Sequence, residues 1–134
     1  MSEQSLNTID VLIAVDVLAA TTHGLGENVY MMDTSKYMGS NGEGQAELET
    51  GCKDGQIIRW TVQPVSPGTN IKILRFTGDA VNTGICNPKE VDVTEPFWEG
   101  RVESQGQSRR VQYSVVLSVN NQELSFDPFL EIKA

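Results

Sequence analysis

The sequence is short of basic side chains, histidine and cysteine. Its 134 residues contain 10 Lys and Arg against 18 Asp and Glu, which gives a formal net charge of −8. Nucleic acids and anionic membranes are bound by clustered cations, so this balance argues against both classes of partner. The length fits one domain over residues 1–134, with enough chain to bury a core without a disulfide or a metal.

Long apolar runs are missing as well. The longest, Val11–Ala20, is interrupted by Asp16 and is too short to cross a hydrocarbon core of about 30 Å. The N-terminal residues are polar and carry Glu3 where a secretion signal would be basic. We therefore expect a soluble, cytoplasmic protein. In that reducing compartment Cys52 and Cys86 are expected to be free thiols, since a disulfide would require their Cα atoms to approach within about 7 Å.

The scarcity of histidine restricts catalysis. His23 is the single histidine, so any Ser-His-Asp or Cys-His arrangement has to use it, and its glycine-rich surroundings indicate an exposed loop. Zinc-ligand spacings are absent, and neither Gly24–Gly26 nor Gly39–Gly44 has the sequence context of a phosphate-binding loop. No Asp-rich calcium loop occurs. We therefore expect the protein to have no enzymatic activity, no cofactor and no metal site. The carboxylates are expected to form a solvated acidic surface.

Alternation of apolar and polar residues with a period of two is the dominant pattern. It predicts strands over 57–63 and 111–119, and over 71–76 with a β-bulge where the apolar phase shifts. A central strand is expected over 9–17, because both of its faces are apolar at the centre. The helical candidate is a turn or two around 17–22. The other strand candidates are 29–32, 46–49, 91–94, 97–103, 123–126 and 129–133.

Turn residues separate these segments. The pairs Asp54-Gly55 and Asn120-Asn121 tolerate positive φ and predict tight hairpin turns. Further loops are indicated at 64–68 and at Asn87-Pro88. Eight or nine short strands with frequent turns and no alternating helices predict an all-β fold, specifically a single-domain antiparallel β-sandwich.

Aromatic and methionine side chains are the best candidates for binding contacts. Trp60 is in phase with neighbouring apolar residues, which predicts core packing. Phe97 and Trp98 are adjacent and point to opposite faces, which leaves one of them a candidate for an edge, an interface or a sugar-stacking surface. Methionine adapts to irregular contacts. The candidate ligand or self-association contacts are Tyr30, Met32, Tyr37, Met38 and Trp98, against the alternative of ordinary core and rim packing.

Several segments follow one another in the order and spacing of a known family. They are Ile9–Asp16, Val29–Met32, Gly42–Leu48, the segment 51–60 ending in Arg59-Trp60, Tyr113–Leu117, and Phe126-Asp127-Pro128-Phe129. In this order they resemble the PixA/AidA inclusion-body protein family over nearly the whole chain. The resemblance implies a bacterial cytoplasmic β-sandwich that is deposited in inclusions or expressed under quorum-sensing control, and it brings no catalytic residues.

The chain departs from that family in two ways. Residues 19–28 are short where relatives often carry a longer loop, and four methionines do not make a methionine store. We hypothesise a non-enzymatic protein that self-associates into a homo-oligomer. The alternative is a lectin-like module that binds a carbohydrate or another small ligand, stacking Trp98 or Tyr37 on it. Because the charge of −8 opposes association, assembly is expected to strengthen as salt rises or as pH falls toward the pI of about 4.5.

Overall fold

The computed structural model describes residues 8–18, 28–34, 48–65, 69–91, 94 and 96–134. In these ranges the chain forms an all-β fold of the sandwich type, as the alternation predicts. The elements are β1 (Ile9–Val15), β2 (Val29–Asp33), β3 (Glu49–Lys53), β4 (Ile57–Pro64), β5 (Ile71–Thr77), α2 (Asp79–Asn82), β6 (Lys89–Glu90), β7 (Trp98–Arg101), β8 (Arg109–Gln112), β9 (Ser114–Val119), β10 (Gln122–Phe126) and β11 (Phe129–Lys133). No helix in the described ranges is long and apolar enough to cross a membrane.

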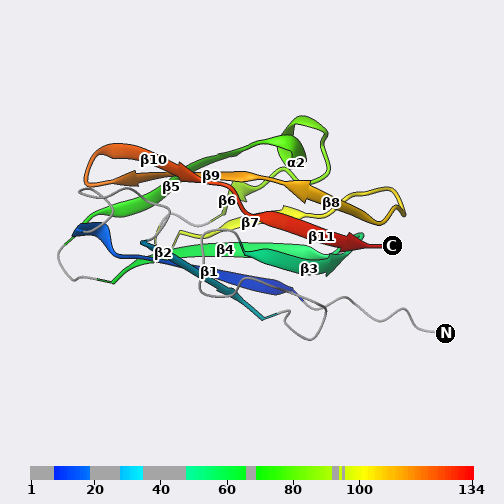
Figure 1. Ribbon diagram of the computed structural model, residues 1–134, viewed down its shortest axis with the longest axis horizontal. Helices are drawn as coiled ribbons and strands as arrows, with labels where there is room; N and C mark the ends of the chain where they lie inside the picture. Colours follow the sequence, from blue (N-terminus) through cyan, green and yellow to red (C-terminus); the bar gives the residue numbers. More distant parts are fainter. Residues whose placement is uncertain (1–7, 19–27, 35–47, 66–68, 92–93, 95) are drawn as a thin grey trace.

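The described strands form three sheets, which build the sandwich. One has the strand order β2-β1-β4-β7-β6, the second β10-β9-β5 and the third β3-β11-β8. In Figure 1, β1 and β4 form the lower layer, and β5 and β9 lie above them. The third sheet connects the layers at one end, because β3 adjoins β4 below, β8 adjoins β9 above, and β11 pairs with both β3 and β8.

Strand pairing is mixed, which corrects the expectation of a purely antiparallel sandwich. β1 pairs with β4 in parallel, from Ile9 opposite Ile58 to Val15 opposite Pro64. β11 pairs with β3 in parallel as well, whereas the other ladders are antiparallel. Parallel and antiparallel strands share the same two-residue alternation, so the sequence pattern does not distinguish them.

Several local predictions are confirmed. β1 lies between β2 and β4, inside its sheet. The ladder between β5 and β9 shifts register between Ile73 and Arg75, where the apolar phase slips. The hairpin predicted at Asn120-Asn121 joins β9 and β10, with φ of 49° and 68° at the two residues. At Asp54-Gly55 the tight turn is present, with φ 89° at Gly55, but it joins β3 and β4, which lie in different sheets, so it is not a hairpin.

Other boundaries are corrected. The predicted strand 111–119 breaks at Tyr113 into β8 and β9, which belong to different sheets. The amide of Tyr113 donates to the carbonyl of Pro128 at this break. Both halves face one core, so the alternation continues without a change of phase. Of the strand predicted at 46–49, Leu48 is not in a strand and Glu49 begins β3, whereas residues 46–47 lie outside the described residues. Of the strand predicted at 91–94, Val91 and Thr94 are not in a strand and residues 92–93 lie outside the described residues; β6 ends at Glu90.

The helical predictions are also incomplete. Val17 and Leu18 are helical, whereas the rest of the predicted 17–22 turn lies outside the described residues. The structure adds α2 after β5, and its four residues are too few to show a helical period in the sequence. Gly78, with φ 96° and ψ −171°, leads into this helix.

An aromatic cluster fills the space between the two layers. The Trp60 ring lies 4.8 Å from the Phe76 ring and 5.7 Å from the Tyr113 ring, measured between centroids. The indole Nε1 of Trp60 donates to Tyr113 Oη at 3.1 Å. Burial raises the pKa of this tyrosine, which keeps it neutral. Trp60 is 1% exposed, which confirms it as a core residue.

Candidate functional site

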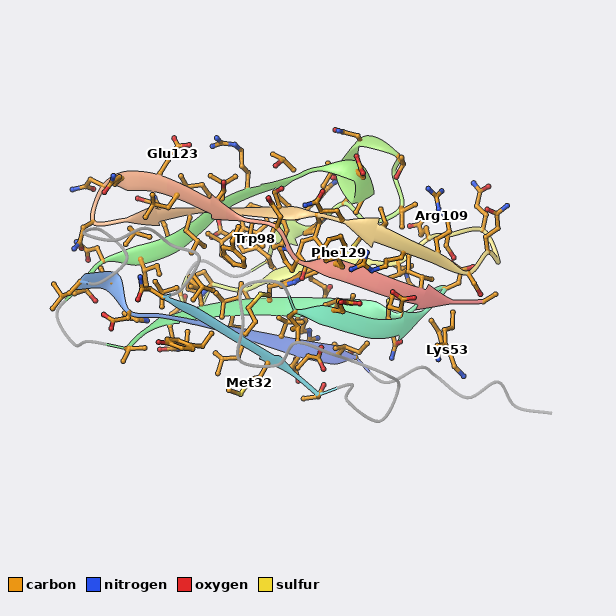
Figure 2. All side chains as sticks on the ribbon, in the orientation of Figure 1. Met32, Lys53, Trp98, Arg109, Glu123 and Phe129 are labelled. Carbon is orange, nitrogen blue, oxygen red and sulfur yellow. The ribbon has the colours of Figure 1, made fainter. Side chains whose placement is uncertain are left out.

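The predicted contact residues occupy two different surfaces. Tyr30 and Met32 lie on β2, with 42% and 43% of their surface exposed. Trp98 opens β7 and is half-buried. Figure 2 shows Trp98 between the two layers and Met32 on the far side of the lower layer. Tyr37 and Met38 lie outside the described residues, as does His23. The structure therefore does not bring Trp98 together with Tyr30 and Met32.

The first surface is the outer face of the five-stranded sheet. Its register sets Met32 opposite Leu12 and Tyr30 opposite Ala14, and all four side chains alternate with buried neighbours. We call these four residues the outer patch. On β4 the patch continues to Thr61, which is opposite Leu12. The result is an exposed surface of uncharged side chains across three adjacent strands.

A charged row borders the outer patch. Arg59 lies opposite Asp10 on β1 and opposite Glu99 on β7. Its Nε is 2.9 Å from Glu99 Oε2, and its guanidinium carbon lies 5.2 Å from the centroid of the Phe97 ring. This contact partly covers Phe97, so Phe97 and Trp98 are both half-buried and neither ring is fully exposed.

The second surface is a groove beside Trp98. Trp98 pairs directly with Trp60 across β4 and β7, which puts both side chains on the inner face of the sheet. The Trp98 ring packs 5.4 Å from Phe76, centroid to centroid. Next to it is a cavity of about 500 Å³, which we call the side groove. Its lining residues are Thr61, Val62, Gln63, Ile71, Lys72, Ile73, Glu90, Pro96, Phe97 and Trp98.

The topology explains why the side groove is open. β7 begins at Trp98, opposite Trp60, so in the described part of the chain no β7 partner accompanies β4 beyond that point. β5 is the edge strand of its own sheet and pairs only with β9 among the described strands. Two strand edges thus flank the cavity. The sequence pattern indicates Trp98 as a contact residue but gives no sign of the groove, because the groove depends on where β7 begins.

The two cysteines offer no reactive nucleophile. Cys52 and Cys86 are buried free thiols. Burial raises the pKa of each to about 12, so both are protonated at neutral pH. Cys86 Sγ also fits closely against β7, 2.9 Å from where a Cβ on Gly100 would lie. These thiols act as small apolar groups in the core.

Asp54 holds two turns together, a role that no local sequence pattern indicates. Its carboxylate accepts hydrogen bonds from the backbone amides of Ser104 and Gly106, each at 2.7 Å. These bonds hold the pKa of Asp54 below its ordinary value of 3.8. Within the described ranges no group of three His, Cys, Asp or Glu side chains could hold a metal ion. Asp54 is therefore a structural carboxylate.

Comparison with known proteins identifies the family. The model of a domain of unknown function, DUF8788, matches residues 7–125. The chain belongs to this family. No curated protein matches the sequence of this DUF8788 chain at a significant level.

A solved structure has a similar fold. It is the crystal structure of PixA, an inclusion body protein from Burkholderia cenocepacia J2315, with a TM-score of 0.70 and 12% sequence identity. The similarity covers 98% of this chain and 97% of that chain. At this identity the likeness establishes the fold alone. The resemblance to PixA/AidA proteins in the sequence is thus supported at the level of the fold.

Proposed function

We propose that this DUF8788 protein is a non-enzymatic, PixA-like protein that self-associates through the outer patch. The observation that carries the proposal is the exposure of Tyr30 and Met32, side by side with Leu12 and Ala14 on one sheet face. The similar fold of PixA, whose name describes an inclusion body protein, supports the same role. Deposition in cytoplasmic inclusions under quorum-sensing control belongs to the same proposal.

Apolar burial would drive this association. An outer sheet face that stays in water is commonly polar, whereas Tyr30 and Met32 expose large apolar groups on adjacent rows. Tyrosine and methionine are also enriched at protein interfaces. Covering them gains about 25 cal/mol per Å² of apolar surface removed from water. A second copy presents the same patch, so a two-fold pairing would cover both patches at once.

Charge opposes this association and makes it tunable. Each copy carries a net charge of −8, so two copies repel at neutral pH and low salt. Screening by salt shortens the range of that repulsion to about 8 Å at physiological ionic strength. Protonation toward the pI of about 4.5 removes the charge itself. Assembly should therefore increase with salt and with falling pH.

The test is the mass of the full chain in solution. Sedimentation equilibrium is measured over a range of protein concentrations, at pH 7 and pH 5, in low and high salt. We expect the weight-average mass to rise above 14.7 kDa, the mass of one chain, most strongly at pH 5 and in high salt.

Matched variants locate the interface. Tyr30→Ser and Met32→Ser should each weaken association, whereas Val91→Ser should not, although Val91 is 54% exposed. Val91 lies outside the outer patch, so it controls for a general loss of surface hydrophobicity. A strictly monomeric protein under every condition, or equal effects of all three variants, would contradict the proposal.

A further inference from the structure

We propose that the side groove binds a small, uncharged, planar aromatic molecule. This inference is independent of self-association, because the apolar walls of the groove lie between the layers, whereas Tyr30 and Met32 lie on the opposite face of the sheet; Thr61 borders both surfaces. The argument rests on the side chains that line the groove, on the strand edges beside it, and on its charge.

Apolar side chains supply the walls of the groove. Trp98 packs against Phe76 on one side and lines the cavity, and it is half-buried. Val62, Ile71 and Ile73 come from the inner faces of β4 and β5 and line the same cavity. A flat ring fits such a site, since offset stacking or edge contacts on an indole add to the gain from apolar burial.

Backbone edges supply the polar groups. Thr61, Gln63 and Lys72 alternate with Val62, Ile71 and Ile73, so their side chains project from the outer faces of the two sheets. They reach the groove along the edges of β4 and β5, where the described strands leave the backbone without a ladder partner. Backbone amides and carbonyls are suited to orient a ring nitrogen or a hydroxyl in a site with apolar walls.

Charge and polarity narrow the class of ligand. Lys72 and Glu90 both line the groove, so their opposite charges offset each other, and Lys72 also borders a second surface with Ser118 and Asn121. The chain carries −8 overall, which disfavours anions. A sugar needs several polar side chains around its ring, whereas the wall here is mainly aliphatic and aromatic. An uncharged aromatic ring fits best.

Size agrees with this assignment. The groove has a volume of about 500 Å³. Pockets for small molecules and cofactors typically measure about 300–1,000 Å³. A molecule of two or three fused rings fits within that volume beside Trp98, Ile71 and Ile73.

The experiment is a fluorescence titration of the full chain with 1-aminoanthracene, a neutral three-ring amine, at pH 7. We expect saturable enhancement of the probe at one site per chain. Two variants test the place of binding. Ile71→Trp fills the groove and Trp98→Leu removes the stacking surface, and each should weaken binding at least about tenfold. Met32→Trp adds the same side chain on the outer patch and should leave binding within about twofold.

Competitors and folding controls distinguish the alternatives. Circular dichroism of each variant shows that it is folded, and the two groove variants disturb the site by opposite means. Displacement of the probe by N-acetylglucosamine would assign the groove to sugars and overturn the aromatic proposal. Equally tight binding of the anionic dye 1-anilinonaphthalene-8-sulfonate, unaffected by either groove variant, would overturn it as nonspecific adsorption. Absence of saturable binding would overturn it directly.

The outcome is separable from that for self-association. Sedimentation equilibrium of the same variants measures assembly. Ile71→Trp and Trp98→Leu should have the same weight-average mass in solution as the wild-type protein. Groove variants that lose probe binding but assemble normally would support the groove proposal alone. Outer-patch variants that lose assembly but bind the probe normally would support the self-association proposal alone.

Discussion

Trp60 and Trp98 are cross-strand partners with different environments. They lie directly opposite each other on β4 and β7 and face the same side of the sheet. Trp60 is 1% exposed, with its indole N–H bound to Tyr113, whereas Trp98 is half-buried beside a cavity of about 500 Å³. Residue type, strand pairing and face are the same for both.

The opposite layer makes the difference. Among the aromatic rings of the described residues, it packs both Phe76 and Tyr113 against Trp60, and Phe76 alone against Trp98. A side chain that faces inward is therefore not automatically a core residue, because closure depends on the second sheet. One end of the sandwich is packed for stability, and the side next to Trp98 is open for contact.

The largest expected effect on stability comes from substituting the two tryptophans. Trp60→Ala should lower the free energy of unfolding by about 4 kcal/mol, because it removes a fully buried ring and leaves a cavity. Trp98→Ala should cost less than half as much, since that ring is already partly in water. Urea unfolding followed by circular dichroism measures both. Equal losses would show that the Trp98 side is as closed as the Trp60 side.

A backbone substitution on the closed side should come next. Gly78 has φ 96°, and a Cβ there would lie 3.1 Å from both Tyr113 Cα and Ser114 N. Gly78→Ala should cost about 3 kcal/mol, because strain and backbone collision add. Gly84→Ala is the matched control: its φ is 77° but nothing lies within 4 Å of the added Cβ. It should cost about 1 kcal/mol in the same thermal or urea unfolding.

The hydrogen bond in the closed region should have a smaller effect. Tyr113→Phe leaves the buried indole N–H of Trp60 without its partner, which should cost about 1–2 kcal/mol. Tyr30→Phe makes the same chemical change on an exposed tyrosine and should stay within about 0.5 kcal/mol. Chemical denaturation of the two variants compares them. A Tyr113→Phe variant as stable as wild type would show that this bond adds nothing to ring packing.

Acid should loosen β7, the strand that carries Trp98, with the smallest effect. The pKa of Asp54 is lowered in the folded state, so its contribution is present above the ordinary pKa of 3.8 and is lost as pH falls through the lower folded pKa. The adjoining turn holds the chain just after β7, where the amide of Gly55 donates to the carbonyl of Val102. Below about pH 4, acrylamide quenching of Trp98 should therefore rise before that of Trp60.

Asp54→Asn gives the control for this pH dependence. Its amide oxygen keeps an acceptor without the charge, so the variant should lose less stability than wild type over the same acid range. Single-tryptophan proteins, Trp60→Phe and Trp98→Phe, separate the two signals. Parallel acid profiles for wild type and Asp54→Asn would contradict the role assigned to this carboxylate.

Local features of the fold were predictable where a residue type carried its own backbone preference. Asn120, Asn121 and Gly55 adopt the positive φ expected of them, and the phase slip in 71–76 marks a true bulge. The break at Tyr113 was not predictable, because β8 and β9 face the same core. The alternation of apolar and polar residues therefore keeps its phase from one strand to the next. The parallel pairing of β1 with β4 and of β11 with β3 was not predictable either, because it leaves no pattern in the local sequence.

The candidate sites divide in the same way. Alternation predicts that Phe97 and Trp98 point to opposite faces, and the exposed Tyr30 and Met32 follow from the alternation of β2. The side groove depends on where β7 starts and on β5 being an edge strand, which are properties of the assembled sheets. The Asp54 contacts join residues about 50 positions apart, so no local pattern indicates them.

The two parallel ladders also set the order in which the chain can fold. β1 acquires its β4 neighbour only after the segment through Pro64 has been synthesised, and β3 waits for β11, whose Phe129 lies opposite Glu49. Contacts this distant in sequence slow folding to about the millisecond-to-second range. On the ribosome β1 emerges long before its partner β4, and β3 long before its partner β11. The nascent chain is therefore most prone to aggregate midway through translation, when its strand edges are unpaired. The synthesis of β11 near the end of the chain covers the exposed edge of β3.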